Sequence, residues 1–341
     1  MTQKIVTFGE IMLRLSPPSF RRFVQAESFD ATYGGAEANV AVALAYFGVP
    51  VDYVTRLPEN DLGNACLNYL RRFGVCTDNI IRGGDRLGIY FLEIGAAQRE
   101  IKVIYDRANS AIAAVKPGMI EWEKVFSNAK WFHWTGITPA ISEGAATVCL
   151  EGTRKAKEMG LTVSCDLNYR SQLWKWNKTP EKIMSEMMKT VDIAIGNEVA
   201  IEKFFGIEIP REYAITSKVE ADRYSYIGEK LMKRFSNLQK VAITLRRKLS
   251  SSHNSWSGVL YDGGTLYTAP TYQITHIIDR VGGGDAFAAG LIYGLLNSKG
   301  NIQKALDFAV AASCLKHSIE GDSNLVTLAE VEDLAFGQGA K

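Results

Sequence analysis

Short apolar segments rich in β-branched residues alternate along the chain with longer segments whose apolar residues follow a helical repeat. The strand-like segments are Ile5–Phe8, Val51–Thr55, Trp131–Trp134, Leu161–Asp166, Val191–Ile195 and Val241–Leu245. The helix-like segments are Ala38–Phe47, Leu67–Phe73, Gly144–Met159, Val199–Phe205, Ile227–Phe235 and two that begin near Ala286 and Ile302. Such alternation is typical of parallel strands joined by crossover helices. The pattern predicts an α/β fold with a doubly wound, mostly parallel sheet flanked by helices.

One stretch interrupts this alternation and predicts a β-hairpin. Ile89–Ile94 and Glu100–Tyr105 are strand-like and flank a Gly-Ala-Ala-Gln-Arg turn. Together with an early strand over Ile11–Ser16, the hairpin predicts a small second sheet that lies over the mouth of the main sheet as a lid. We expect this lid to be formed by about residues 10–33 and 86–108.

The whole sequence predicts one domain, covering residues 1–341, without a linker or an internal repeat. Two polar stretches, Glu208–Arg223 and Arg246–Ser257, predict loops. The hydrophobic content of 47%, the charged content of 22% and the net charge of +2 are those of an ordinary globular protein, so nucleic acid is not expected as a partner.

The composition also limits the setting of the protein. The N-terminal residues are strand-like and do not resemble a signal peptide, and no segment has the apolar length of a membrane span. The five cysteines and four histidines are scattered without C-x-x-C or H-E-x-x-H spacing. We therefore expect a cytoplasmic protein without a membrane partner, a disulfide framework or a zinc site.

Three consecutive glycines precede one of the predicted helices. Asp279-Arg-Val-Gly-Gly-Gly-Asp285 is followed at once by an apolar run from Ala286 to Leu296. Converging backbone N–H groups at a helix N-terminus favour an anion such as phosphate. A carboxylate there would repel a resting phosphate, so Asp285 suits a base that takes a proton from a hydroxyl attacking phosphorus. A tight turn with Asp285 as an ordinary N-cap is the alternative at this point.

Polar residues that follow predicted strands are further candidates, because ligands of doubly wound sheets bind beyond the carboxyl ends of the strands. Asp166-Leu-Asn168-Tyr-Arg170 follows one strand, Asn197 the next and Thr244-Leu-Arg246 a later one. The chain has no G-x-x-x-x-G-K-[ST] motif, which excludes a P-loop nucleotide site.

These features together resemble the ribokinase-like sugar kinases, also called the PfkB family, over the whole chain. Within that family the sequence is most similar to kinases of the sugar acid 2-keto-3-deoxygluconate. The resemblance rests on Gly34-Gly-Ala-Glu-Ala-Asn39, Tyr105-Asp-Arg-Ala-Asn-Ser-Ala111, Asp166-Leu-Asn-Tyr-Arg-Ser-Gln-Leu-Trp174 and Lys316-His-Ser-Ile-Glu-Gly-Asp322, besides the glycine loop.

The resemblance implies a sugar-binding end and a catalytic loop. It makes Asp285 the catalytic base, and it assigns an anion hole to Gly282, Gly283 and Gly284. It assigns the substrate contacts to Gly34, Gly35, Asn39, Tyr90, Tyr105, Arg107, Arg170, Asp285 and Asp322. Several of these residues have a purely structural role as the alternative. A Gly-Gly pair often begins a helix, tyrosines in strands often pack against neighbouring side chains, and arginines in hairpins are often solvated.

For the nucleotide, the resemblance implies contacts from Asn168, Asn197, Thr244, Arg246, Gly282, Gly284 and Ser313, with adenine near Ala309 and Ser313. Two motifs depart from the family pattern. The metal-linked N-x-x-E motif is Asn197-Glu-Val-Ala200 here and lacks its final glutamate, which leaves the Mg²⁺ ligands unassigned. The usual T-x-G is Thr244-Leu-Arg246, which predicts a side chain that reaches the nucleotide phosphates.

The resemblance therefore implies transfer of phosphate from ATP, with Mg²⁺, to the 6-hydroxyl of 2-keto-3-deoxygluconate in sugar-acid catabolism. Arg107 and Arg170 favour a sugar acid, because guanidinium groups suit a carboxylate. A related kinase of fructose or ribose and a catalytically silent sugar-acid sensor are the alternatives. The resemblance also implies a homo-oligomer formed through the lid, and it leaves a requirement for a monovalent cation open.

Overall fold

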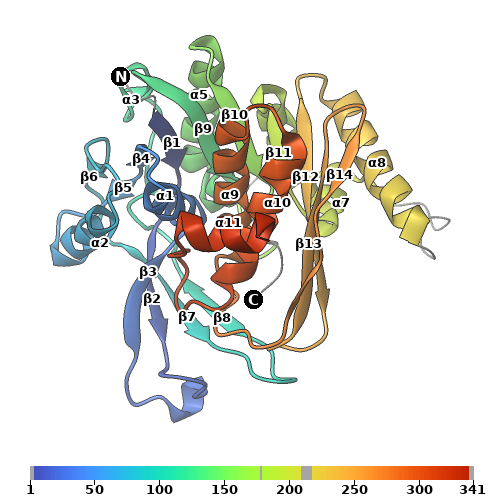
Figure 1. The fold of residues 1–341 in the computed structure, drawn as a ribbon. Helices are drawn as coiled ribbons and strands as arrows, with labels where there is room; N and C mark the ends of the chain where they lie inside the picture. The colour runs from blue at the N-terminus through green and yellow to red at the C-terminus, as the bar shows by residue number, and fades with distance from the viewer. Residues whose placement is uncertain (1–3, 177–178, 209–216, 338–341) are drawn as a thin grey trace.

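The computed structural model describes residues 4–176, 179–208 and 217–337 (Figure 1). Within these residues the chain forms a nine-stranded main sheet, a four-stranded small sheet and a two-stranded ribbon of β5 (Arg56–Leu57) and β6 (Ile81–Arg82). The main sheet has the order β14-β13-β12-β11-β10-β9-β1-β4, and β15 also pairs with β13. Its strands are β1 (Lys4–Phe8), β4 (Val51–Val54), β9 (Ala129–Thr135), β10 (Thr162–Asp166), β11 (Ile193–Gly196), β12 (Lys240–Lys248), β13 (Asn254–Tyr261), β14 (Leu266–Thr268) and β15 (Tyr272–Ile274).

The main sheet is parallel from β4 through β12 and becomes antiparallel at β13. Its inner strands are almost continuous apolar runs, and all four residues of Ile193–Gly196 are buried. Such runs belong to parallel strands that are covered on both faces. The predicted doubly wound, mostly parallel sheet is therefore confirmed.

Helices cover both faces of the main sheet, because successive side chains of each strand point to opposite sides. Phe132 of β9 packs in one core with α3, α5, α6, α7 and α8, whereas its neighbour Trp131 packs in a second core with α1, α2, α9 and α10. Figure 1 shows α9 and α10 in front of the sheet. The helices are α1 (Ala36–Tyr46), α2 (Asp61–Arg72), α3 (Trp122–Val125), α4 (Thr138–Ile141), α5 (Glu143–Glu158), α6 (Pro180–Met187), α7 (Glu198–Phe205), α8 (Ser217–Arg234), α9 (Gly283–Asn297), α10 (Ile302–Lys316) and α11 (Leu328–Phe336).

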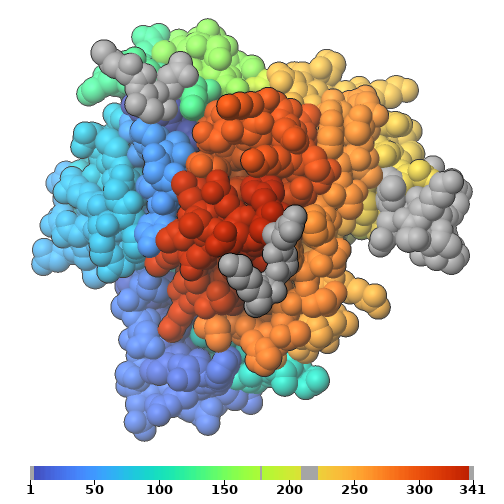
Figure 2. Space-filling view, in the orientation of Figure 1, coloured from blue at the N-terminus to red at the C-terminus, as the bar shows by residue number. Residues whose placement is uncertain are grey.

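The small sheet contains the predicted hairpin, β7 (Gly88–Glu93) and β8 (Lys102–Asp106). Its order is β3-β2-β7-β8, with β2 (Met12–Ser16) parallel to β7 and β3 (Asp30–Gly34) antiparallel to β2. The sheet projects from one end of the molecule, at the bottom of Figures 1 and 2. A small separate sheet is thus confirmed, while the exact extent of the lid and the single-domain assignment stay predictions.

The predicted loop over Arg246–Ser257 is wrong at both ends, because the loop between β12 and β13 covers only residues 249–253. Arg246 and Lys248 continue β12, where they pair with Trp256 and Asn254 of β13 in an antiparallel ladder. The polar side chains did not reveal this strand, because the last three residues of β12 are exposed and can be polar. The second predicted loop, Glu208–Arg223, is wrong from Ser217, where α8 begins, and residues 209–216 lie outside the described residues.

Among the described residues, no helix combines the length and apolarity that crossing a membrane would need.

Candidate active site

The three glycines form the start of α9, as the sequence predicts. Gly282 is the N-cap and has a φ of 83°, a conformation that glycine adopts readily and other residues do not. A side chain at Gly282 would also collide with the backbone carbonyl of Asp322. The loop is therefore built for glycine, and it places the first N–H groups of α9 at one point, where the helix dipole favours a negative charge.

Asp285 lies in the first turn of α9 and is buried. Its Oδ2 accepts a hydrogen bond of 2.7 Å from Nδ2 of Asn39, in the first turn of α1. Burial raises the pKa of Asp285 to about 6, while Asn39, Arg170 and Lys316 limit that rise. A carboxylate with a pKa this close to neutrality can be ionised and still accept a proton, as a general base must.

Asp166, at the end of β10, is a second buried carboxyl group of this site; it was a candidate from the sequence but was given no role there. Its Oδ2 lies 4.0 Å from the place where a side chain of Gly284 would begin. Burial and the charge of Asp285 raise its pKa to about 7. Its position at the end of a predicted strand, two residues before Asn168, is the signal that made it a candidate.

The structure brings the predicted sugar-binding residues Gly34, Tyr90 and Asp322 together. Tyr90 Oη donates a hydrogen bond of 2.6 Å to Oδ2 of Asp322, and both side chains are buried. A side chain at Gly34 would begin 2.7 Å from Tyr90 Oη and would collide with Asp322. A side chain at Gly35 would collide with the carbonyl of Glu10. The glycine pair therefore does more than begin α1. Because the glycines have no side chains, the lid and the C-terminal loop can both pack against this part of the chain.

Arg107 is not free on the lid. It is buried and forms an ion pair with Glu10, in which its Nε lies 2.7 Å from Oε2. The other Glu10 oxygen accepts a hydrogen bond of 2.6 Å from Ser110, and the Arg107 guanidinium lies over the ring of Tyr105. Arg107 and Tyr105 therefore lie together, but Glu10 already neutralises the arginine. A substrate carboxylate would meet a paired guanidinium, held in place by Glu10.

Arg170 differs from Arg107, because its side chain is exposed. Its positive charge limits the rise in the pKa of Asp166 and Asp285. Burial lowers the pKa of the Arg246 guanidinium most, and the nearby charge of Arg170 lowers it further. Arg280, between Asp279 and the glycines, contributes to the same effect on Arg246. The three arginines form a cationic surface beside the anion hole, and Arg280 was not assigned from the sequence.

The predicted nucleotide-binding residues Asn168, Thr244 and Asn197 have different surroundings in the structure. Asn168 has an unusual φ of 36°, and its N–H bonds Oδ1 of Asp166 at 3.2 Å, so it belongs to the catalytic edge. Thr244 donates a hydrogen bond of 3.2 Å to the carbonyl of Gly196. Asn197 caps α7 by accepting a bond of 2.9 Å from the N–H of Ala200, which is a sufficient structural reason for this residue.

Ser313 lies beneath the anion hole. Its fully buried hydroxyl donates a hydrogen bond of 2.6 Å to the carbonyl of Gly283, and Ala309 is fully buried as well. His317, one turn further along α10, is also buried and bonds the carbonyl of Ser313 through Nδ1. The Ser313 hydroxyl thus supports the backbone of the glycine loop. Its contact with adenine stays a prediction, and that contact would require the hydroxyl to rotate away from the Gly283 carbonyl.

The side chains near Asn197 do not form a cage for a cation. Glu198 is in an ion pair with Arg223, and Glu202 is exposed on α7. Nowhere in the described part of the chain do three His, Cys, Asp or Glu side chains lie together as metal ligands.

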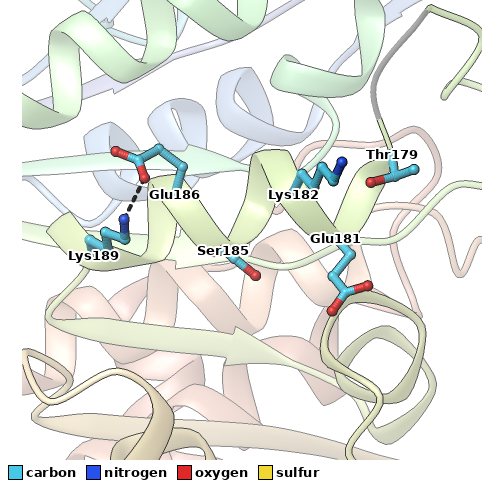
Figure 3. A pocket seen from close by; sticks show the side chains of 6 residues that line it. All are labelled: Thr179, Glu181, Lys182, Ser185, Glu186 and Lys189. Carbon is cyan, nitrogen blue, oxygen red and sulfur yellow. Dashed lines mark hydrogen bonds and ion pairs between the residues drawn. The ribbon is translucent and has the colours of Figure 1, made fainter.

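A hollow on the surface lies along α6, and none of the site residues named above lines it (Figure 3). It is lined by Thr179, Glu181, Lys182, Ser185, Glu186 and Lys189, and its charged pair Glu186–Lys189 is 2.6 Å apart. All six residues come from one continuous stretch, from the N-cap of α6 to the 3-10 turn that follows it, so the hollow has none of the converging elements of the site at α9.

The fold and this site define a class of protein. The family model described as pfkB family carbohydrate kinase matches residues 2–327, and the chain belongs to this family. The membership predicted from the sequence motifs is therefore confirmed.

The chain is similar to particular kinases over nearly its full length. It shares 48% identity with the crystal structure of a 2-dehydro-3-deoxygluconokinase from Thermotoga maritima, with a TM-score of 0.92 and 98% of each chain covered. It is 32% identical to a 2-dehydro-3-deoxygalactonokinase of Haloferax volcanii, covering 100% of this chain and 99% of that protein. A fructokinase from Xylella fastidiosa with bound ATP shares the fold at 22% identity, with a TM-score of 0.78 and 98% of each chain covered.

Proposed function

We propose that the protein transfers phosphate from ATP to the 6-hydroxyl of 2-keto-3-deoxygluconate. The similarity to the two 2-dehydro-3-deoxy sugar-acid kinases supports this substrate class. The observation that carries the proposal is the hydrogen bond from Asn39 to Asp285, because it joins the glycine pair of the sugar end to the base of the anion-hole loop. A hydroxyl held near Gly34 and Asn39 would lie beside a carboxylate of raised pKa.

The mechanism follows from the position of that carboxylate. Asp285 would accept the proton of the sugar hydroxyl while the oxygen attacks the γ-phosphorus of ATP in line. Negative charge that develops on the transferring group would be stabilised by the N–H groups at Gly283 and Gly284 and by the exposed Arg170. Magnesium bound with the nucleotide would supply further positive charge at the phosphates.

The two predicted substrate arginines would have different tasks. Arg107 is fixed by Glu10 and covers Tyr105, so it would shape the lid side of the sugar site and offer its remaining N–H groups to the sugar acid. Arg170 is exposed and close to Asp166 and Asp285, so it would contact the sugar carboxylate or the transferring phosphate. Arg246 and Arg280 would bind the nucleotide phosphates.

The lid also supports a homo-oligomer. In β7 and β8, Tyr90 and Leu92 point inward, so Phe91 and its cross-strand partner Ile104 lie on the outer face. Ile104 is 56% exposed, and Phe29, which contacts Phe91, is 41% exposed. An apolar outer sheet face of this kind suits the same face of a second copy. We propose a dimer through the lid, acting in the cytoplasm, where ATP is available.

A coupled kinase assay tests the function directly. The assay compares 2-keto-3-deoxygluconate, its galactonate epimer, fructose and ribose, with Asp285→Asn as the chemically disabled control. We expect phosphorylation of the keto-deoxy sugar acids, weak or no phosphorylation of the neutral sugars, and at least a ~10²-fold lower turnover in Asp285→Asn. Preference for fructose or ribose would replace the substrate assignment, and no turnover of ATP with any sugar would favour a sensor.

A further inference from the structure

Arg14 is a charged residue of the lid whose side chain is buried inside the molecule, whereas a surface arginine ordinarily extends into solvent. It lies in the middle of β2, and its side chain is 2% exposed, whereas its apolar neighbours Leu13 and Leu15 are partly exposed on the outer face. Burying a guanidinium is costly unless carboxylates and other acceptors compensate it. The inward position of Arg14 therefore requires partners within the molecule.

Two carboxylates and a hydroxyl supply that compensation. Nη1 of Arg14 lies 2.6 Å from Oδ1 of Asp322, and Nη2 lies 2.6 Å from Oδ2 of Asp279. Nε donates a hydrogen bond of 2.9 Å to Ser16 on the same strand. Both carboxylates are buried, so each guanidinium nitrogen has a partner in a site closed to water.

Each carboxylate belongs to a segment that forms part of the active site. Oδ1 of Asp279 accepts a hydrogen bond of 3.0 Å from the N–H of Val281, directly before Gly282. The backbone carbonyl of Asp322 is the group against which Gly282 lies. The second side-chain oxygen of Asp322 accepts the Tyr90 hydroxyl beside Gly34. Arg14 thus connects the lid to both ends of the site.

We propose that Arg14 is a positioning residue for phosphoryl transfer: by holding Asp279 and Asp322 it fixes the lid sheet to the anion-hole loop and orients Asp322 toward the sugar. The proposal rests on the proposed function, since it assigns roles within that site. Arg14 itself would not touch the reacting atoms.

The charges around Asp322 distinguish this role from simple packing. Asp322 is faced by Arg14 from β2, Tyr69 from α2, Tyr90 from β7, Asp279 before α9, Asp285 from α9 and Lys316 from α10. Burial raises the pKa of Asp322, and Arg14 opposes that rise. Lys316 is a weaker substitute, because its Nζ bonds the carbonyls of Asp279 and Ile319 instead of a carboxylate. Without Arg14, protonated Asp322 should therefore persist to higher pH.

The test compares Arg14→Met and Arg14→Lys with Arg99→Met as a matched control. Arg99 is also a lid arginine with a carboxylate partner, Glu93, at 2.9 Å, but it contacts neither Asp279 nor Asp322. We expect Arg14→Met to lower kcat/KM for the sugar acid roughly ten- to a hundredfold and to move the acid limb of its pH profile upward. Arg14→Lys should recover part of the rate, and Arg99→Met should behave like the unmodified protein.

A second variant keeps the test decisive if the Arg14 variants fail to fold. Asp279→Asn leaves Arg14 paired with Asp322, so we expect a lower kcat with little change in the KM for the sugar acid. Folded Arg14→Met with the rate and pH profile of Arg99→Met would overturn the proposal, as would unchanged kcat in Asp279→Asn. Absence of sugar-acid phosphorylation in the unmodified protein would instead overturn the proposed function.

Discussion

At the scale of single residues, Asp285 and Asp166 show how burial prepares carboxyl groups for proton transfer. Both lie at the edge where the strands of the main sheet end and α9 begins, and both have pKa values raised mainly by burial. Their charges repel each other, so the pair loses its second proton less readily than an isolated aspartate would. Asn39 binds the Asp285 carboxylate and limits the rise of its pKa.

These pKa values predict an acid limb in the rate profile. Asp285 must be ionised to act as the base, and its pKa is about 6, so kcat/KM should rise with pH through that value and level off above it. At pH 5 we expect roughly a tenfold lower rate than on the plateau. The measurement is kcat/KM for the sugar acid between pH 5 and 8.5.

Asp166→Asn provides the comparison for this limb. Asp166, with a pKa of about 7, is mostly protonated in the range where Asp285 titrates, so a neutral amide at this position should leave the limb close to its original pH, whatever its effect on the plateau rate. A rate that is independent of pH between 5 and 7 in the unmodified protein would exclude Asp285 as the titrating base.

At the scale of elements, the turn of the β7–β8 hairpin is attached to the far side of the site. The N–H of Ser251, in the β12–β13 loop, donates a hydrogen bond of 2.7 Å to the carbonyl of Ala97, and the N–H of Ala97 bonds Ser252 at 3.2 Å. Glu100 is paired with Lys248 and lies 3.7 Å from Arg280. The lid hairpin therefore spans from the sugar end to the cationic surface proposed for the nucleotide.

This attachment involves few bonds, most of them exposed, so the hairpin should be among the less stable parts of the molecule. We expect hydrogen exchange over residues 89–107 to slow when sugar acid and a non-hydrolysable ATP analogue are bound together, because the substrate adds contacts to Tyr90 and Tyr105. Peptides from the buried strand β10 serve as the control and should not change. Equal exchange of the hairpin with and without ligands would show that it is a fixed element.

At the scale of the whole molecule, the outer lid face predicts the oligomeric state. Ile104→Asp places a charge in the centre of the proposed contact and should convert a dimer to a monomer in sedimentation or light-scattering measurements. Met159→Asp, at the end of α5, changes a similarly exposed apolar residue outside the small sheet and should leave the dimer intact. A monomeric unmodified protein, or a dimer that survives Ile104→Asp, would contradict a contact through the lid.

The sequence by itself determined the features that depend on local pattern. Apolar runs and helical repeats indicated the doubly wound sheet, the alternation in the hairpin indicated β7 and β8, and three glycines before an apolar run indicated the start of α9. These predictions succeeded because each rests on residues close together in the chain, where periodicity and glycine conformation act directly. The same reasoning missed the outer part of β12, because its polar residues pair with β13.

Only the tertiary structure decided which charges face each other. The alternation of β2 placed Arg14 on a polar face, which local reasoning would assign to water, yet Asp279 and Asp322 bury it across more than 260 residues of chain. The pairing of Arg107 with Glu10 likewise joins segments 97 residues apart. Burial and ion pairing depend on such distant contacts. Burial raises the pKa of Asp285, and the ion pair with Glu10 distinguishes Arg107 from the exposed Arg170.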